Sequence, residues 1–464
     1  MEQTEVKRVP PPHVFRSLAA VIVGSLVLRA AGGAMGENIQ FYFNAIHAAA
    51  LSSTHPLRQI VAASDLQEIS YTVGGIILGA YFASELLGAM VLGAWSDRFG
   101  RKLFILLGPL LGAVAVLITS VTTVIWLLVV TRLLEGLATA SNAPATLGYI
   151  AETTADSPKL RVRVSGLFEV ATIGGAALGF WLGGWLWHEY GTAARIFGIP
   201  FTSPAFAINS LIYLASLAIL WVGIQEIREK SHISVRQAVS PIETLKEYWA
   251  LARNPLIASF APAWIAINAV LGIWTNHSAR ILTDKIDAGG QLLVGRFNAL
   301  QAGNIVAVYA GFFILGIVIW SVFFPGIKKT TAMLIGSGGL VASCILISAI
   351  NHQRSTDSPF TLILAALLVI SILVQSAFTP AALAYLADIT ETQTSSRGAI
   401  MGLYSVFLGL GQVIGLSGGG VFIDISGADG MALATGLLGL CAGIFVVRLR
   451  GSEAELQSPS NASH

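Results

Sequence analysis

Gly93-Ala-Trp-Ser-Asp97-Arg98-Phe-Gly100-Arg101-Lys102 is a short segment, dense in charge, that separates two long apolar runs. Charged residues make up only 11% of the 464-residue chain, so four of them within six positions stand out. The two glycines suit a tight connection, because glycine lets helices approach closely and permits turn conformations that other residues avoid. We therefore expect this segment to connect two helices that lie in an apolar environment.

The composition of the whole chain indicates that this environment is a lipid bilayer. Hydrophobic residues make up 55% of the chain and the mean hydropathy is +0.73, too apolar for a protein that presents a charged surface to water. A helix needs about 20 apolar residues to cross a bilayer, because its backbone must satisfy its own hydrogen bonds there. We predict an all-α integral membrane protein with twelve transmembrane helices, over residues 15–41, 70–94, 103–121, 123–148, 164–187, 203–224, 256–277, 300–324, 331–350, 359–384, 398–422 and 429–447. The first run is too long for the apolar part of a signal peptide, and we expect it to remain as a helix.

Lys and Arg residues are distributed unevenly between the two sides of these helices. Of the 27 Lys and Arg residues, 19 fall on the side that holds the amino terminus and six on the other. Cytoplasmic connections of membrane proteins carry such an excess. We expect a multi-pass protein of the cell membrane, plasma or inner, with both termini in the cytoplasm.

The longest polar stretch between the apolar runs, 225–255, divides the twelve helices six and six. A repeat at a fixed offset supports the division, because it superposes Pro144 on Pro380, Glu152 on Asp388, Arg161 on Arg397 and Gly175 on Gly411. We expect two pseudo-symmetric six-helix bundles, 15–224 and 256–447, with cytoplasmic segments at 1–14, 225–255 and 448–464. Parallel repeats in transporters place a substrate cavity between the two bundles.

Four segments resemble signatures of the major facilitator superfamily. The opening segment, read as Gly93-x-x-x-Asp97-Arg98-x-Gly100-Arg101-Lys102, is similar to the family's loop 2–3 signature. Leu128-x-x-x-Arg132-x-x-Glu135-Gly136-x-Ala138-x-Ala140 is similar to its helix 4 signature. Tyr149-Ile-Ala-Glu152 leading to Arg161, and Tyr385-Leu-Ala-Asp388 leading to Arg397, are similar to its helix 4–5 and helix 10–11 connections. The resemblance implies the fold of that family and secondary transport by alternating access.

The resemblance also implies a gate on the cytoplasmic side. In that family the loop is a latch, so Asp97 would meet the start of helix 11 near Gly398, and Arg101 would pair with Glu152. The whole expected gate comprises Gly93, Asp97, Arg98, Gly100, Arg101, Lys102, Glu152, Asp388 and Arg397. The simpler alternative is an ordinary basic loop, which accounts for the cations but not for Asp97 or the glycines.

Four charged residues lie deep inside the apolar runs: Arg29, Glu85, Arg132 and Glu135. Each costs about 2.5–3.5 kcal/mol at the bilayer centre, so we expect these side chains to face a cavity or one another. A buried carboxyl beside a guanidinium can couple proton binding to conformation. Glu85 is our first candidate for the proton carrier and Glu135 the second, with Arg132 as charge partner. The alternative is a static network that only pins the helices together. Glu37 and His277 lie toward the outer ends of their runs, where we expect edge or interfacial positions.

Small residues recur at four-residue spacing in the fifth helix, at Gly175, Gly179 and Gly183, and again in the eleventh, at Gly411, Gly415 and Gly419. The fifth-helix pattern resembles the antiporter signature of drug-exporting families, although Phe180 stands where those families have a proline. The alternative role, close packing of helices, needs no signature at all.

We expect a secondary transporter of small molecules, coupled to protons, with expulsion of amphiphilic compounds favoured and working as a monomer in the lipid bilayer. Proton-coupled uptake of a sugar, organic acid or other metabolite is one alternative, and a non-transporting membrane sensor or scaffold with the same fold is another. The eight histidines show no metal-ligand spacing, and we expect no cofactor, no metal, no enzymatic activity and no nucleic-acid partner.

Overall fold

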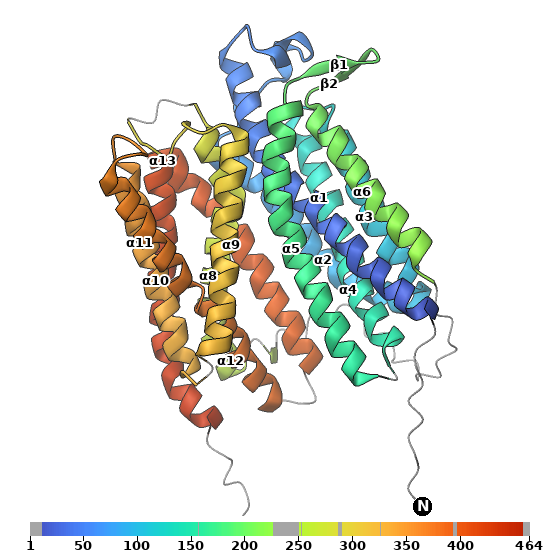
Figure 1. The fold of residues 1–464 in the computed structure, drawn as a ribbon, viewed down its shortest axis with the longest axis vertical. Coiled ribbons are helices and arrows are strands. Elements are labelled where there is room, and N and C mark those ends of the chain that lie inside the picture. Colours follow the sequence, from blue (N-terminus) through green and yellow to red (C-terminus); the bar gives the residue numbers. More distant parts are fainter. Residues whose placement is uncertain are drawn as a thin grey trace, which may run out of the picture.

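The computed structural model describes residues 12–155, 157–225, 250–251, 253–285, 290–324, 326–392 and 397–457. Nearly all of them are helical, and the helices form two bundles that stand side by side (Figure 1). Ten helical segments are long and apolar enough to cross a membrane. One of these, Leu403–Arg450, has 48 residues and bends at Gly427, so it crosses twice, and α4 supplies the twelfth crossing.

The first bundle contains six helices: α1 (Pro12–Leu51), α2 (Tyr71–Phe99), α3 (Arg101–Thr119), α4 (Ile125–Thr153), α5 (Pro158–Tyr190) and α6 (Pro204–Gly223). Two short 3-10 helices, η1 (Pro56–Gln59) and η2 (Ala63–Asp65), connect α1 to α2. A two-stranded antiparallel hairpin, β1 (Ala194–Ile196) and β2 (Ile199–Phe201), connects α5 to α6 and pairs Ala194 with Phe201.

The second bundle contains α8 (Pro255–Thr283), α9 (Ala299–Phe323), α10 (Lys329–Asn351), α11 (Pro359–Gln375), α12 (Phe378–Thr392) and α13 (Arg397–Gln457). The helices α11 and α12 form a single crossing that is interrupted at Ser376 and Ala377. The long α13 contains two crossings joined at Gly427, whose φ of 61° is open to glycine at little cost.

Among the boundaries that differ from those expected, three bear on the site and its gates. The first helix continues ten residues past position 41, because Asn38 and Gln40 are buried and Asn44 is half-buried against α8, so these polar residues need not end an apolar span. The expected loop from Gly93 is mostly helical: α2 runs to Phe99, and α3 begins at Arg101. Gly100 alone breaks the path, with a φ of 102° that side chains disfavour. The expected helices 398–422 and 429–447 run together in α13.

The glycine stripes lie where helices touch. On α5, a Cβ atom at Gly175 would lie 2.5 Å from the Leu26 carbonyl oxygen of α1, and one at Gly179 would lie 2.6 Å from that of Ala30. On α13, a Cβ atom at Gly411 would lie 2.5 Å from the Ile265 carbonyl oxygen of α8. Further along the same seams, Gly183 lies against Ala34 and Glu37, Gly415 against Ala269, and Gly419 against Ile273. The two bundles therefore repeat one close contact between their first and fifth helices.

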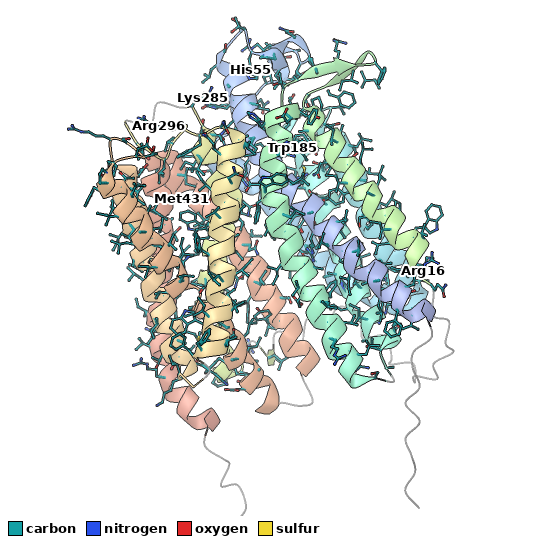
Figure 2. All side chains as sticks on the ribbon, in the orientation of Figure 1. Arg16, His55, Trp185, Lys285, Arg296 and Met431 are labelled. Atoms are coloured by element: carbon teal, nitrogen blue, oxygen red, sulfur yellow. The ribbon has the colours of Figure 1, made fainter. Side chains whose placement is uncertain are left out.

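The two ends of the bundles differ in the segments that they hold, and we call them the terminal face and the hairpin face. The terminal face holds the start of α1, the end of α13 and the connection between α2 and α3, and the hairpin face holds η1, η2 and the β hairpin (Figure 1). Arg16 lies toward the terminal face, whereas His55, Lys285 and Arg296 lie toward the hairpin face (Figure 2).

Candidate functional site

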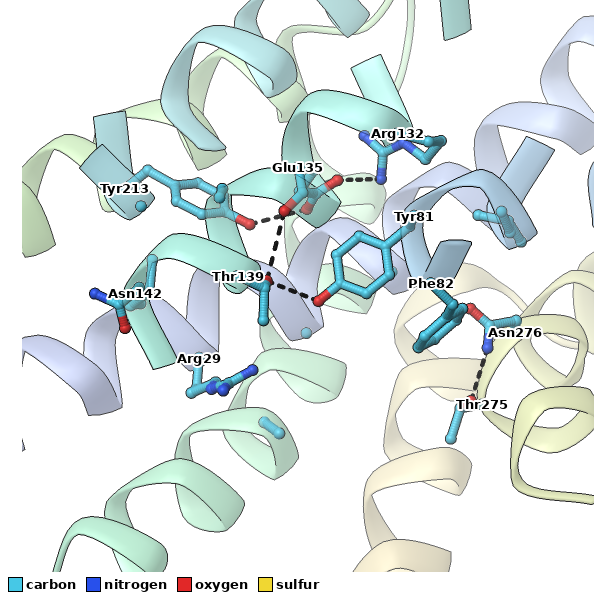
Figure 3. Close-up of a pocket in the computed structure, with 18 of the residues that line it drawn as sticks. Arg29, Tyr81, Phe82, Arg132, Glu135, Thr139, Asn142, Tyr213, Thr275 and Asn276 are labelled. Atoms are coloured by element: carbon cyan, nitrogen blue, oxygen red, sulfur yellow. Dashed lines mark hydrogen bonds and ion pairs between the residues drawn. The ribbon is translucent and has the colours of Figure 1, made fainter. Parts of the chain in front are cut away.

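A cavity of about 270 Å³ lies inside the protein, and most of its wall belongs to the first bundle. Arg29, Tyr81, Arg132, Glu135 and Tyr213 contribute polar side chains from α1, α2, α4 and α6 (Figure 3). The second bundle contributes Thr275 and Asn276 of α8. Apolar wall comes from Leu28, Leu78, Phe82, Ala138, Ala176 and Phe180. The cavity therefore combines an aromatic and aliphatic wall with a few charged groups, as small-molecule sites do.

Arg132 and Glu135 form an ion pair one turn apart on α4, and both are buried, with 3% and 4% of their surfaces exposed. The hydroxyl of Tyr213 on α6 donates a hydrogen bond of 2.9 Å to Glu135 Oε1 (Figure 3). Two further donors of Arg132, Nε and Nη2, have no hydrogen-bond partner among the described residues. Because a buried donor without a partner costs about 1–3 kcal/mol, this guanidinium is placed to receive another group.

Arg29 and Glu85 occupy the same region but are not an ion pair. Arg29 lines the cavity, and none of the hydrogen bonds or ion pairs among the described residues involves it. The charge of Arg29 acts on the Glu85 carboxyl, which lies one turn beyond Tyr81 on α2 and outside the cavity wall. Tyr81 itself shares a hydrogen bond of 2.8 Å with Thr139 of α4. The four charges expected inside the membrane therefore gather around one cavity, with Glu85 set back from it.

Glu37 is not at an edge, contrary to expectation. Its exposed fraction is 0%, and neither carboxylate oxygen has a hydrogen-bond partner among the described residues. Because α1 continues to Leu51 and α5 packs against it at Gly183, the carboxyl is covered on the side that sequence alone suggested was open. A charged carboxylate without partners is costly to bury, which makes Glu37 a third candidate carrier of a proton.

The two bundles are tied together toward the hairpin face by Arg280, which lies near the end of α8 and has only 1% of its surface exposed. Its Nε donates a hydrogen bond of 3.1 Å to Asn44 Oδ1, and its Nη1 donates one of 3.0 Å to the Ser70 carbonyl oxygen. Its Nη2 donates to the carbonyl oxygen of Ile69. All three acceptors belong to the first bundle. We refer to Arg280 and these partners as the hairpin-face seal.

Two acids of the second bundle extend the seal. Asp424 of α13 accepts hydrogen bonds of 2.7 and 2.9 Å from the backbone N–H groups of Tyr71 and Thr72, at the start of α2. Because the amino end of a helix carries partial positive charge, a carboxylate is well placed there. Asp284 accepts a hydrogen bond of 2.8 Å from the Tyr71 hydroxyl.

The seal was not predicted from the sequence, because Arg280 is one of the six Lys and Arg residues on the side away from the amino terminus, and His277 was expected at an interfacial position at the outer end of its helix. His277 is in fact buried, and its Nε2 lies 3.0 Å from the Leu416 carbonyl oxygen. A usable signal was present in the spacing: His277, Arg280 and Asp284 follow one another at three and four residues, which places them on one face of a helix.

On the terminal face, Arg101 Nε donates to Glu152 Oε1 at 2.9 Å, and its Nη1 donates to Ser96 Oγ at 2.8 Å. Arg101 and Glu152 therefore meet where the family resemblance placed them. Lys102 donates to the Ile224 carbonyl oxygen at 2.7 Å, and Arg98 lies 5.5 Å from the ring centre of Phe99.

The second bundle has a matching pair, because Lys329, the first residue of α10, forms an ion pair with Asp388 of α12. Arg101 is likewise the first residue of α3. The side chains of Asp97 and Arg397 lie outside what the structure describes, so the contact expected between Asp97 and the start of the eleventh helix stays a prediction.

Comparison with known proteins agrees with this architecture. The pattern of the Major Facilitator Superfamily matches residues 18–284 and again 258–464. An uncharacterized MFS-type transporter of Methanocaldococcus jannaschii is 26% identical over 377 residues, which are 80% of this chain and 87% of that protein. Multidrug resistance protein 2 of Bacillus subtilis is 23% identical over 373 residues, 78% of this chain and 82% of that protein.

The fold also matches a solved structure, that of a bacterial homolog of the human lysosomal transporter Spinster in an inward-facing and unoccupied conformation. The TM-score is 0.69 at 14% identity, over 97% of this chain and 100% of that one. Since the family pattern covers both bundles and the twelve crossings fall six and six, the chain belongs to the Major Facilitator Superfamily.

Proposed function

We propose that this transporter carries amphiphilic small molecules by alternating access and that protons drive it. One observation carries the mechanism: hydrogen bonds between the bundles gather toward the hairpin face, from Gln40–Thr275 to Asp424–Thr72. In alternating access, one face is closed while the other is open, and the two exchange roles to move a substrate across. We therefore take this arrangement as the conformation in which the hairpin face is shut.

We further propose that the terminal face is cytoplasmic. Described cations that support this lie at or near that face: Arg16, Arg98, Arg101, Lys102, Arg161, Arg163, Lys328, Lys329, Arg448 and Arg450. Those near the hairpin face are Arg58, Arg195, Arg280, Lys285, Arg296 and Arg354, and Arg280 is buried in the seal. Short connections rich in Lys and Arg stay on the cytoplasmic side.

The ion pairs of the terminal face give each bundle its own rigid end. The pair Arg101–Glu152 joins α3 to α4, and the pair Lys329–Asp388 joins α10 to α12, so neither crosses between bundles. In the opposite conformation, we propose that Asp97 at the end of α2 meets the start of α13. The free energy of that contact would replace part of what is lost when the Arg280 seal opens.

Proton coupling is proposed for the carboxyls near the cavity. Glu135 is held by Arg132 and Tyr213, so a substrate that takes either partner also changes how strongly Glu135 holds a proton. Glu85 feels the charge of Arg29 in the same way. Glu37 has no such partner, and its proton would exchange when α1 and α8 separate at the hairpin face.

The aromatic wall of the cavity supports an amphiphilic guest, since Tyr81, Phe82 and Phe180 offer flat apolar surface beside charged groups. Similarity to a multidrug resistance protein supports expulsion as the direction. Uptake of an organic acid is a second candidate, and one observation favours it: two arginines line the cavity.

Reconstituted vesicles test the proposal. Purified protein is placed in vesicles loaded with the pH-sensitive dye pyranine, a pH gradient is imposed, and a panel of toxins and nutrients is added one by one. We expect at least one compound to change the rate of proton movement in the native protein and in the control Arg354→Gln, whose side chain is exposed and outside the cavity. Unchanged proton-driven flux in both Glu85→Gln and Glu135→Gln would refute the coupling assignment. If no compound of the panel changes the rate of proton movement, the sensor or scaffold alternative is favoured.

A further inference from the structure

We propose that the cavity holds an anionic amphiphile, with the negatively charged head group at Arg29 and the apolar body against Tyr81, Phe82 and Phe180. This inference rests on the proposed function, because it names the class of substrate for the same cavity. It is carried by the imbalance of charge in the cavity wall and by the free donors of the two arginines.

The cavity wall carries more positive than negative charge. Among the described residues that line the cavity, Arg29 and Arg132 are cationic and Glu135 is the one acid. Glu135 already accepts from Arg132 and from Tyr213, so it cannot also neutralise Arg29. Glu85 lies behind the wall, where its charge acts on Arg29 without forming an ion pair. The described side chains of the wall itself therefore carry two positive charges and one negative charge.

Both arginines of the wall have hydrogen-bond donors that can serve a ligand. A guanidinium carries five N–H donors in a fixed planar fork, which suits the oxygens of a carboxylate, sulfonate or phosphate. Arg29 makes no hydrogen bond or ion pair within the described part of the chain. Arg132, nearly all buried, keeps Nε and Nη2 unpartnered, and Figure 3 shows Tyr81 and Thr139 between the two arginines. Two charged donors with spare capacity at one cavity point to an anion rather than to a cation or a neutral body alone.

The packing of α5 against α1 holds Arg29 in place. Gly175 of α5 brings that helix against α1 at this level, where a Cβ atom would lie 2.9 Å from the Arg29 Cβ. The close approach fixes the Cβ end of the Arg29 side chain between α1 and α5, while its guanidinium reaches the cavity. Such positioning lowers the entropy lost when a ligand is bound.

An anion and a proton should then bind together. A negative head group at Arg29 or Arg132 weakens the hold of those arginines on Glu85 and Glu135, and it adds negative charge beside both carboxyls. Both effects favour the protonated carboxyl. Binding is reciprocal, so a proton on either carboxyl strengthens anion binding. The sign of this linkage moves anion and proton in the same direction, as the second candidate function, uptake of an organic acid, requires.

Three matched probes test the head group: naphthalene-2-sulfonate, naphthalene-2-sulfonamide and trimethyl(naphthalen-2-ylmethyl)ammonium. They share an aromatic body and carry a negative, neutral or positive head. Isothermal titration calorimetry is run with the full chain in nanodiscs of zwitterionic lipid. We expect the sulfonate to bind at least about tenfold more tightly than the sulfonamide, because a hydrogen bond to a charged group contributes about 1.5–3 kcal/mol.

Variants locate the head group. Arg29→Gln should bring the affinity for the sulfonate down to that of the sulfonamide, and Arg29→Lys should retain part of the preference because it keeps the charge but not the fork. Arg354→Gln, remote from the cavity, should leave the preference unchanged. Size-exclusion profiles that match the native protein show that each variant is folded, and Arg29→Lys provides a second test if Arg29→Gln fails to fold.

Repeating the titration in two buffers of different ionisation enthalpy measures protons taken up with the sulfonate, and we expect uptake. Equal affinity for the three probes, a preference for the ammonium, no binding by any of them, or proton release on sulfonate binding would each overturn the inference. None of these outcomes removes the proposed function, because the vesicle panel can still reveal transport of a neutral or cationic compound.

Discussion

The guanidinium carbon of Arg280 lies 4.0 Å from the centre of the Tyr71 ring, across the interface between the two bundles. The ring covers a cation whose remaining donors are all directed at the first bundle. A cation over an aromatic face gains about 2 kcal/mol when both are desolvated. The Tyr71 hydroxyl donates a hydrogen bond to Asp284, the residue that follows α8. Tyr71 therefore contacts both the cation and the acid at this end of α8.

Replacing Arg280 should therefore open the hairpin face. Arg280→Gln loses the ring contact and most of the donors, and we expect the population to shift toward the conformation in which the terminal face is closed. Spin labels at Ser53 and Thr356, both exposed on the hairpin face of different bundles, report the opening as a longer distance by double electron–electron resonance. The labels are placed in a background in which Cys344 and Cys441 are serine.

The control for this measurement is Arg195→Gln, an exposed cation on the β hairpin that is outside the seal. It should leave the distance distribution as in the native protein. An unchanged distribution in Arg280→Gln would mean that the apolar cluster around Phe41, Ile273 and Ile423 holds the face shut without the arginine.

The buried pair on α4 predicts an unusual pattern of stabilities. Glu135→Gln leaves Arg132 buried without its counter-ion, and such a loss costs about 3–5 kcal/mol in buried pairs. Replacing both residues by glutamine removes the unpaired charge, so the double variant should be more stable than Glu135→Gln alone. Thermal unfolding in detergent, followed by tryptophan fluorescence, measures the order.

A double variant that is less stable than both single variants would show that the pair is net stabilising in itself. That result would support the static network, in which Arg132 and Glu135 only pin helices. A double variant at least as stable as the native protein would support a pair that is kept at a cost to stability for its role in the cavity.

The exposed ion pair of the terminal face should matter little for stability. Glu152 has 46% of its side chain exposed, and a solvent-exposed pair contributes about 0–1 kcal/mol. Glu152→Gln should therefore lower the midpoint of thermal unfolding by no more than a few degrees. A large fall in the midpoint would show that Arg101 depends on Glu152 to hold α3 and α4 together.

Asp97→Asn addresses the latch directly. We expect the variant to insert and fold like the native protein but to transport more slowly, because the contact of Asp97 with the start of α13 would stabilise only one conformation. Initial rates in proteoliposomes, set against the amount of reconstituted protein, measure the effect. Native rates in Asp97→Asn would remove the latch from the mechanism.

The twelve crossings could be predicted because each depends on about 20 consecutive apolar residues, a local property of the sequence. The pairing of Arg101 with Glu152 could be anticipated only through the family resemblance, since the two lie 51 residues apart. The seal could not be found this way: a cation at a helix end looks the same in sequence whether it meets water or another bundle. Glu37 was misplaced for the same reason, because its burial depends on α5, more than a hundred residues later.

The close contact of α1 with α5 gives the last prediction. A Cβ atom at Gly179 would lie 2.6 Å from the Ala30 carbonyl oxygen and 2.7 Å from Gly33 Cα, both backbone atoms that cannot move alone. Gly179→Ala must push the two helices apart, and overpacking of this kind costs about 1–3 kcal/mol. Gly174→Ala is the matched control on the same helix, because nothing lies within 4 Å of its Cβ position. Alanine there should be neutral or stabilising by up to about 1 kcal/mol, since it favours the helix. Thermal unfolding midpoints should therefore fall for Gly179→Ala and not for Gly174→Ala, and equal midpoints would show that α1 and α5 can separate slightly without loss.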